Sequence, residues 1–97
     1  MLAERRRNFV VPENLPQELL EILADKWGLP VKRFKPSARI VSGLRVPPGD
    51  VHSTTEWLER YYFARFEMED IEADLTVSDY LAHLTQCIRA AHAKVGE

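Results

Sequence analysis

The sequence lacks the features of a secreted, membrane-spanning or disulfide-bonded protein. Its single cysteine, Cys87, excludes an internal disulfide and is compatible with a reducing compartment. No apolar run approaches the roughly 20 residues that a membrane-spanning helix needs. The basic cluster at residues 5–7 is not followed by the apolar segment of a secretory signal. We therefore expect a cytoplasmic protein that has no membrane partner.

The sequence also lacks the motifs of common catalytic and metal sites. It has no glycine-rich phosphate loop. His83 and Cys87 are four residues apart and can share a face of a helix, but His92 falls on another side, and no second cysteine–histidine pair exists. His52 and Ser53 are neighbours at an expected helix start, where two adjacent side chains rarely act as base and nucleophile. We therefore expect neither a metal centre nor an enzyme.

The net charge of −2 is small but unevenly distributed along the chain. Residues 1–48 carry nine Lys and Arg against five Asp and Glu, whereas residues 49–97 carry four against ten. An overall acidic balance disfavours nucleic-acid binding, because nucleic-acid-binding domains are usually basic. Nucleic-acid binding nevertheless remains an alternative for the basic half. Its candidate residues are Arg5, Arg6, Arg7, Lys32, Arg33, Lys35 and Arg39.

Two segments have the apolar spacing of amphipathic helices and clear signals at their ends. The first follows Asn14, the expected N-cap, contains Pro16 in its first turn and ends at Gly28. The other follows Thr76, whose hydroxyl is placed to cap it, and continues to about residue 94. These signals predict one helix near each end of the chain.

The most aromatic stretch covers residues 53–66 and holds five of the nine aromatic residues in the chain. In a helical projection its apolar side chains cover about half of the circumference, more than contact with one neighbouring element requires. We therefore expect a central helix that touches two or more elements and places Trp57 in the core. Ser53 and Glu56 have the spacing of a capping box, which predicts that this helix begins at Ser53. Arg65 falls inside the apolar arc.

The connections between these segments are long. Residues 29–50 contain four prolines and two glycines, so no long helix fits there. We expect a short helical turn around residues 37–42, with short extended pieces as the alternative. The second connection, residues 67–75, is strongly acidic.

The length of the chain suits one domain with a modest core. We expect an N-terminal arm at residues 1–13 and a single helical domain at residues 14–95. The predicted fold class is all-α, a small bundle of three main helices with long connections.

The order of these segments resembles the acyl carrier protein family. Residues 19–29 look like the first helix of that family, and residues 37–44 resemble the segment before its second helix. Residues 57–66 are similar to that second helix, which ends in a phenylalanine. Residues 75–81 look like its last helix, which often opens with a Thr-Val pair. The resemblance covers residues 16–86 and depends mainly on apolar periodicity.

The resemblance implies a carrier that holds phosphopantetheine on the serine of an Asp-Ser-Leu motif. At that place this chain reads Asp50-Val51-His52-Ser53-Thr54. Counting back from the phenylalanine that ends the helix puts His52 in register with the attachment serine. We therefore expect no prosthetic group. Ser53 is the residue that would carry phosphopantetheine in the alternative of a true carrier.

We expect a non-catalytic, carrier-like or protein-interaction module whose acidic residues bind a basic surface of a protein partner. Two alternatives stay open, namely a phosphopantetheine carrier modified on Ser53 and a nucleic-acid-binding accessory domain. The expected partner-binding residues are Glu56, Glu59, Glu67, Glu69, Asp70 and Glu72.

Overall fold

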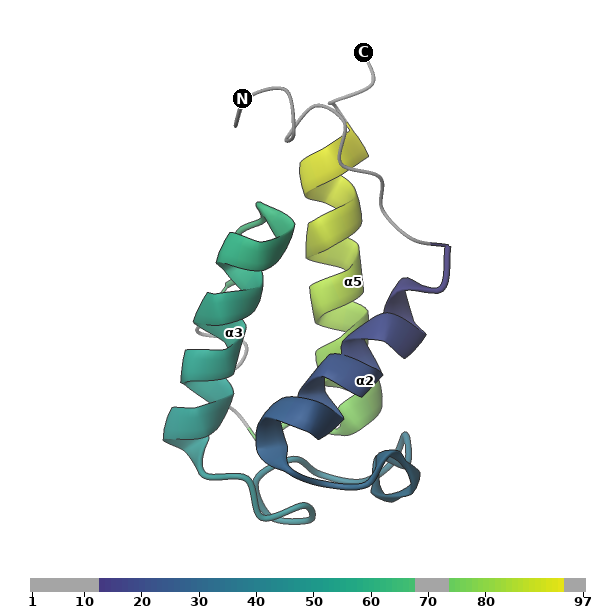
Figure 1. The fold of residues 1–97 in the computed structure, drawn as a ribbon, viewed down its shortest axis with the longest axis vertical. Helices are drawn as coiled ribbons and strands as arrows, with labels where there is room; N and C mark the ends of the chain where they lie inside the picture. Colours follow the sequence, from purple (N-terminus) through teal and green to yellow (C-terminus); the bar gives the residue numbers. More distant parts are fainter. Residues whose placement is uncertain (1–12, 68–73, 94–97) are drawn as a thin grey trace.

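The computed structural model describes residues 13–67 and 74–93 of the chain. Its elements are α2 (Leu15–Trp27), the short 3₁₀ helix η1 (Val31–Arg33), α3 (Pro48–Tyr62) and α5 (Val77–Ala93). Helix α2 contacts both other helices and crosses α5 obliquely (Figure 1). Within the described residues the only β-pairing is one isolated bridge between Arg39 and Thr76. The expectation of a small all-α bundle with three main helices is confirmed.

Helix α2 begins and ends where the sequence predicts. Pro16 lies in its first turn, and Gly28 ends it in the left-handed conformation, with φ of 65°. The N–H of Gly28 donates to the carbonyl of Asp25, and the following N–H donates to the carbonyl of Ala24. These bonds satisfy carbonyls that the end of a helix leaves unpaired. Asn14 is at the N-cap position as predicted, but its side chain makes no capping hydrogen bond, so that part of the prediction is wrong.

Helix α3 begins at Pro48, before the predicted capping box. Prolines suit this position, because the first N–H groups of a helix need no intrahelical partner. The N–H groups of Asp50 and Val51 donate to the Pro47 carbonyl at 2.9 and 3.2 Å. Ser53 consequently lies exposed inside the helix rather than at its start. The predicted capping role of Ser53 is wrong.

The end of α3 also differs from the prediction. Phe63 adopts the left-handed conformation, with φ of 54°, and this stops the helix. The N–H of Ala64 donates to the Glu59 carbonyl at 3.0 Å, and the Glu59 carboxylate accepts the N–H of Phe66 at 2.9 Å. Phe66 therefore returns to the core outside the helix. The helical projection does not apply beyond this point, and Arg65 is exposed rather than part of an apolar arc.

Helix α5 follows the predicted signals closely. The hydroxyl of Thr76 accepts the N–H of Asp79 at 3.1 Å, which is the capping bond that the sequence predicts. Of the apolar side chains that recur at helical spacing, Leu81 is half-buried and Ala91 is exposed. The others are buried as expected, namely Val77, Tyr80, Leu84 and Ile88.

The core is built from all three helices. Its fully enclosed side chains are Leu15, Leu19 and Leu23 from α2, Leu58, Tyr62 and Thr55 from α3, and Tyr80, Leu84 and Ile88 from α5. Every helix thus buries one stripe against the other two, as a small single-core domain requires.

Two tyrosines connect α3 to its neighbours by hydrogen bonds inside this core. The Tyr62 hydroxyl donates to the Glu18 carboxylate of α2, and the hydroxyls of Tyr80 and Thr55 lie 2.7 Å apart. Burial raises the pKa of Tyr80 to about 12. Burial and the bond to Glu18 raise the pKa of Tyr62 above its usual range. The expectation that the central helix contacts two elements is confirmed.

The long connection before α3 is held by backbone hydrogen bonds to the residues that open α5. The N–H of Ile40 donates to the Leu75 carbonyl at 2.9 Å, and the N–H of Val77 donates to the Ala38 carbonyl at 2.8 Å. The N–H of Ser78 donates to the carbonyl of Pro36 at 3.0 Å. These hydrogen bonds satisfy backbone N–H and C=O groups of the connection that are not paired within a helix or a sheet.

Asp74 supports the same connection with its side chain, and we call this set of contacts the Asp74 clamp. Its carboxylate accepts the N–H groups of Val41 and Ser42 at 3.0 and 3.3 Å, and Arg39 donates to its carbonyl at 2.7 Å. Hydrogen bonds from Ser42 are the main cause that lowers the pKa of Asp74. The clamp closes on the expected short turn, in which the N–H of Gly43 donates to the Arg39 carbonyl at 3.0 Å. A Cβ atom at Gly43 would lie 2.5 Å from that carbonyl oxygen, so only glycine fits the turn.

The expected core position of Trp57 is wrong in part, because its indole is half-buried beside the enclosed Leu58. We predict that Leu58→Ala lowers the free energy of unfolding by about 2–5 kcal/mol. Trp57→Ala should cost only about 1 kcal/mol, a typical value for a site that leaves no enclosed cavity. Urea unfolding of both variants checks the pair. Equal losses would contradict the different burial of these neighbours.

Candidate functional site

The predicted partner-binding carboxylates have different environments in the structure. Glu56 is exposed on α3, with its carboxylate 3.7 Å from the imidazole of His52. Glu59 is half-buried and is used internally, because it accepts the N–H of Phe66. Glu67 is exposed. The other three, Glu69, Asp70 and Glu72, lie outside the described residues.

A more concentrated acidic surface lies between α2 and α3, in two adjoining hollows. One, of about 310 Å³, is lined by Glu18, Glu21, Ile22, Asp25, Lys26 and Trp57. The other, of about 370 Å³, is lined by Asp25, Lys26, Trp27, Asp50, Ser53 and Thr54. The two hollows share Asp25 and Lys26, so they form one surface. We call it the acidic face.

The acidic face follows from the spacing of residues on α2. Glu18, Glu21 and Asp25 recur at intervals of three and four, so they lie along one side of the helix. This side adjoins the buried leucine stripe. Helix α3 adds Asp50 and Ser53 from its first two turns. Among the residues that the structure describes, the face therefore carries four carboxylates and one lysine.

Two hydrogen bonds fix the helices on either side of the face. At one end the indole N–H of Trp27 donates to the Thr54 hydroxyl at 2.9 Å. At the other end the hydroxyl of Tyr62 donates to Glu18. Because these bonds join α2 to α3, the surface is held in one geometry without a ligand.

An aromatic pair borders the acidic face. The rings of Trp57 and Tyr61 stack with centroids 4.9 Å apart, and the ammonium of Lys26 lies 3.8 Å from the centroid of Trp57. The side chain of Tyr61 is 49% exposed. Exposed aromatic residues beside charged groups are typical of surfaces that bind proteins.

The residue proposed for a prosthetic group lies on this same surface. Ser53 is exposed in the second turn of α3, and it lines a hollow together with Asp50 and Lys26. Its neighbour Thr54 is buried and accepts the hydrogen bond of Trp27. Thr54 therefore has a structural role, whereas Ser53 presents its hydroxyl at the surface.

The sequence also offered a histidine–cysteine pair and a set of basic residues as candidate sites. The imidazole of His83 and the sulfur of Cys87 lie 3.8 Å apart on α5, as their spacing predicts. Within residues 13–67 and 74–93, no group of three His, Cys, Asp or Glu side chains could hold a metal ion. Of the basic residues suggested for nucleic acid, Arg39 belongs to the Asp74 clamp. The remaining described ones, Lys32, Arg33 and Lys35, are exposed, and residues 5–7 lie outside the described part.

The sequence interpretation missed the contribution of α2 to the candidate site. The predicted binding carboxylates were Glu56, Glu59 and those of the acidic run after residue 66, although Glu21 and Asp25 have the i, i+4 spacing of one helix face. The aromatic pair Trp57 and Tyr61 lies on α3, so its position beside these carboxylates could not be predicted without knowing how α2 packs against α3.

Comparison with protein-family models, with curated proteins and with solved structures finds no match. The resemblance to acyl carrier proteins therefore stays an interpretation of the sequence. Among the helices described, none is both long and apolar enough to span a bilayer.

Proposed function

We propose that this chain is a non-catalytic protein-interaction module of acyl-carrier-like organisation, and that its acidic face binds a basic surface of a protein partner. The observation that carries the proposal is the combination of four carboxylates from two helices with an aromatic pair, the half-buried Trp57 and the exposed Tyr61. Charge attracts and orients a basic partner, and the aromatic rings supply apolar contact area beside the carboxylates.

The geometry of the acidic face supports docking rather than catalysis. Its carboxylates come from two helices that are joined by hydrogen bonds, so the backbone that presents them is already ordered before a partner binds. Glu21, Asp25 and Asp50 are all exposed and can reach a partner. Lys and Arg side chains are the natural counterpart of such a surface, because complementary potentials raise the association rate.

A second candidate function, carriage of phosphopantetheine, is favoured by one observation. The hydroxyl of Ser53 is exposed and does not cap the helix, so it is accessible to a modifying enzyme. The residues around Ser53 disfavour modification, since His52 and Thr54 replace the aspartate and leucine of the Asp-Ser-Leu motif of acyl carrier proteins. Thr54 is moreover committed to Trp27. We keep the unmodified module as the primary proposal.

The acidic face is tested by charge reversal. We predict that Glu21→Lys with Asp25→Lys abolishes capture of the proteins that the wild-type chain retains from lysate. Both side chains are exposed, so the free energy of unfolding should change by less than about 1 kcal/mol. Quantitative pull-down at low and high salt, together with thermal unfolding, checks both statements.

The matched control reverses two exposed carboxylates elsewhere, Glu13→Lys with Asp79→Lys, and changes the net charge by the same amount. This control should retain the captured proteins. Equal loss in both double variants would assign the effect to net charge and would contradict a specific acidic face.

The carrier alternative is tested by mass. We predict that incubation with coenzyme A and a broad-specificity phosphopantetheinyl transferase leaves the intact mass of the chain unchanged. Ser53→Ala provides the control. A gain of one phosphopantetheine mass that disappears in Ser53→Ala would show a working carrier and would replace the primary proposal.

A further inference from the structure

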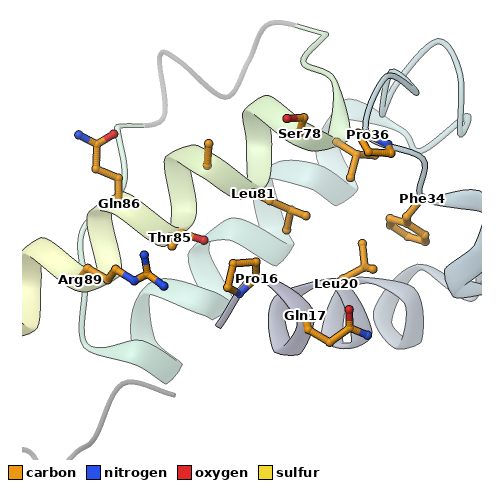
Figure 2. Close-up of a pocket in the computed structure, with 12 residues that line it drawn as sticks. Pro16, Gln17, Leu20, Phe34, Pro36, Ser78, Leu81, Thr85, Gln86 and Arg89 are labelled. Carbon is orange, nitrogen blue, oxygen red and sulfur yellow. The ribbon is translucent and has the colours of Figure 1, made fainter. Parts of the chain in front are cut away.

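Helix α2 borders hollows of different chemistry on two of its sides. One is an apolar groove of about 720 Å³ against α5, and Figure 2 shows the side chains that line it. Pro16 and Leu20 come from α2, Leu81 comes from α5, and Phe34 and Pro36 come from the connection. The described residues of this lining include no carboxylate, and they select no particular ligand. The other is the hollow of about 310 Å³ in the acidic face, where carboxylates and an aromatic ring lie together.

The indole of Trp57 already holds one cation from the chain itself. The ammonium of Lys26 lies 3.8 Å from the centroid of the ring, which is the position of a cation–π contact. Glu18, Glu21 and Asp25 line the same hollow. Within the described residues, however, the ammonium forms no ion pair with any of them. The lysine of the hollow therefore lies on the ring and leaves these carboxylates without a counter-charge.

The carboxylates and the lysine are accessible to a partner. Glu21 and Asp25 are exposed, and Lys26, which covers the indole, is exposed as well. A cation–π contact at an exposed site is weak, so an incoming cation can displace the lysine. The ring of Trp57 is half-buried and stacks on that of Tyr61, with centroids 4.9 Å apart. The ring is thus held in place while its lysine cover can move.

We propose that this hollow receives one arginine side chain of the partner, and that Lys26 occupies the ring in the free protein. A guanidinium is planar, so it stacks on the indole and donates to a neighbouring carboxylate at the same time. An ammonium is a compact point charge, and Lys26 contacts the ring but pairs with none of the carboxylates. A volume of about 310 Å³ is at the lower end of the roughly 300–1,000 Å³ that is typical of small-molecule sites, so it suits one side chain.

The arginine site rests on the proposed function, because it names the group through which a basic partner binds the acidic face. It adds a role for Lys26. When the guanidinium enters, the ammonium moves to solvent, and the loss of its contact with the ring reduces the affinity for the partner. Removal of the lysine should therefore strengthen binding by more than the loss of one positive charge elsewhere on the surface.

The experiment titrates the full chain with a capped hexapeptide of alternating glycine and arginine and follows the indole N–H signals of the two tryptophans. We expect a saturable shift of the Trp57 signal. The Trp27 signal is the internal reference and should shift less, because this N–H is bonded to Thr54. The matching lysine peptide should bind more weakly, and the trimethyllysine peptide more weakly still, because its head group has no N–H to donate.

Lys26→Met and Lys35→Met form a matched pair, since each removes one exposed positive charge. Lys35 lies in the connection and lines neither hollow of the acidic face. At about 0.15 M ionic strength, exposed charges more than about 8 Å apart are largely screened. Lys26→Met should then strengthen binding of the arginine peptide about threefold, because the ring is no longer covered, whereas Lys35→Met should bind like the wild type.

Equal affinities of Lys26→Met and Lys35→Met would overturn the proposal. So would a Trp57 signal that does not respond to the arginine peptide, or tighter binding of the lysine or trimethyllysine peptide. Each of these results leaves the acidic face itself in place. Failure of the proposed function is seen separately, as capture of lysate proteins that survives Glu21→Lys with Asp25→Lys.

Discussion

Hydrogen bonds between the long connection and the residues that open α5 hold this fold in one arrangement. The connection has no long helix and no sheet, so its backbone groups need partners elsewhere. They find them at Leu75, Val77 and Ser78, while the Asp74 carboxylate closes the turn that contains Gly43. Because the connection leads directly into α3, the same contacts help to position the start of that helix against α2. The bundle is therefore held by this connection as well as by helix packing.

Helix α2 gives this arrangement its two different surfaces. One side of the helix carries Glu21 and Asp25 and faces the first turns of α3, where the acidic face lies. Another side carries Pro16 and Leu20 and borders the apolar groove against α5. The clamped connection contributes to the groove directly, since its Phe34 and Pro36 form one end of the lining. The two sides of α2 therefore present surfaces of different chemistry.

Local signals predicted α2 and α5, because Gly28 and Thr76 act within a single turn of the helix that they end or begin. The limits of α3 could not be read in the same way. Its start depends on the proline pair at residues 47–48 rather than on the capping spacing of Ser53 and Glu56. Its end depends on a left-handed Phe63, which no residue preference predicts, and the exposed position of Arg65 follows from it.

The candidate site was less accessible to prediction than the fold. An excess of acidic residues in the second half of the chain predicted a basic partner, and it placed most of the expected binding carboxylates at residues 67–72. The acidic face instead takes Glu21 and Asp25 from the half of the chain that is basic overall, and only the crossing of two helices brings them beside Asp50. The groove left no signal at all, because its lining comes from three segments far apart in sequence.

Amide hydrogen exchange in Asp74→Ala tests the dependence on the clamped connection most directly. Loss of the carboxylate should speed exchange at Val41 and Ser42, which donate to it, and at Ile40 and Val77, whose backbone bonds adjoin it. Amides inside α2, such as that of Leu23, should keep their protection, since none of the hydrogen bonds of the clamp involves α2. Unchanged protection at Ile40 and Val77 would show that the connection is ordered without Asp74 and would contradict this account.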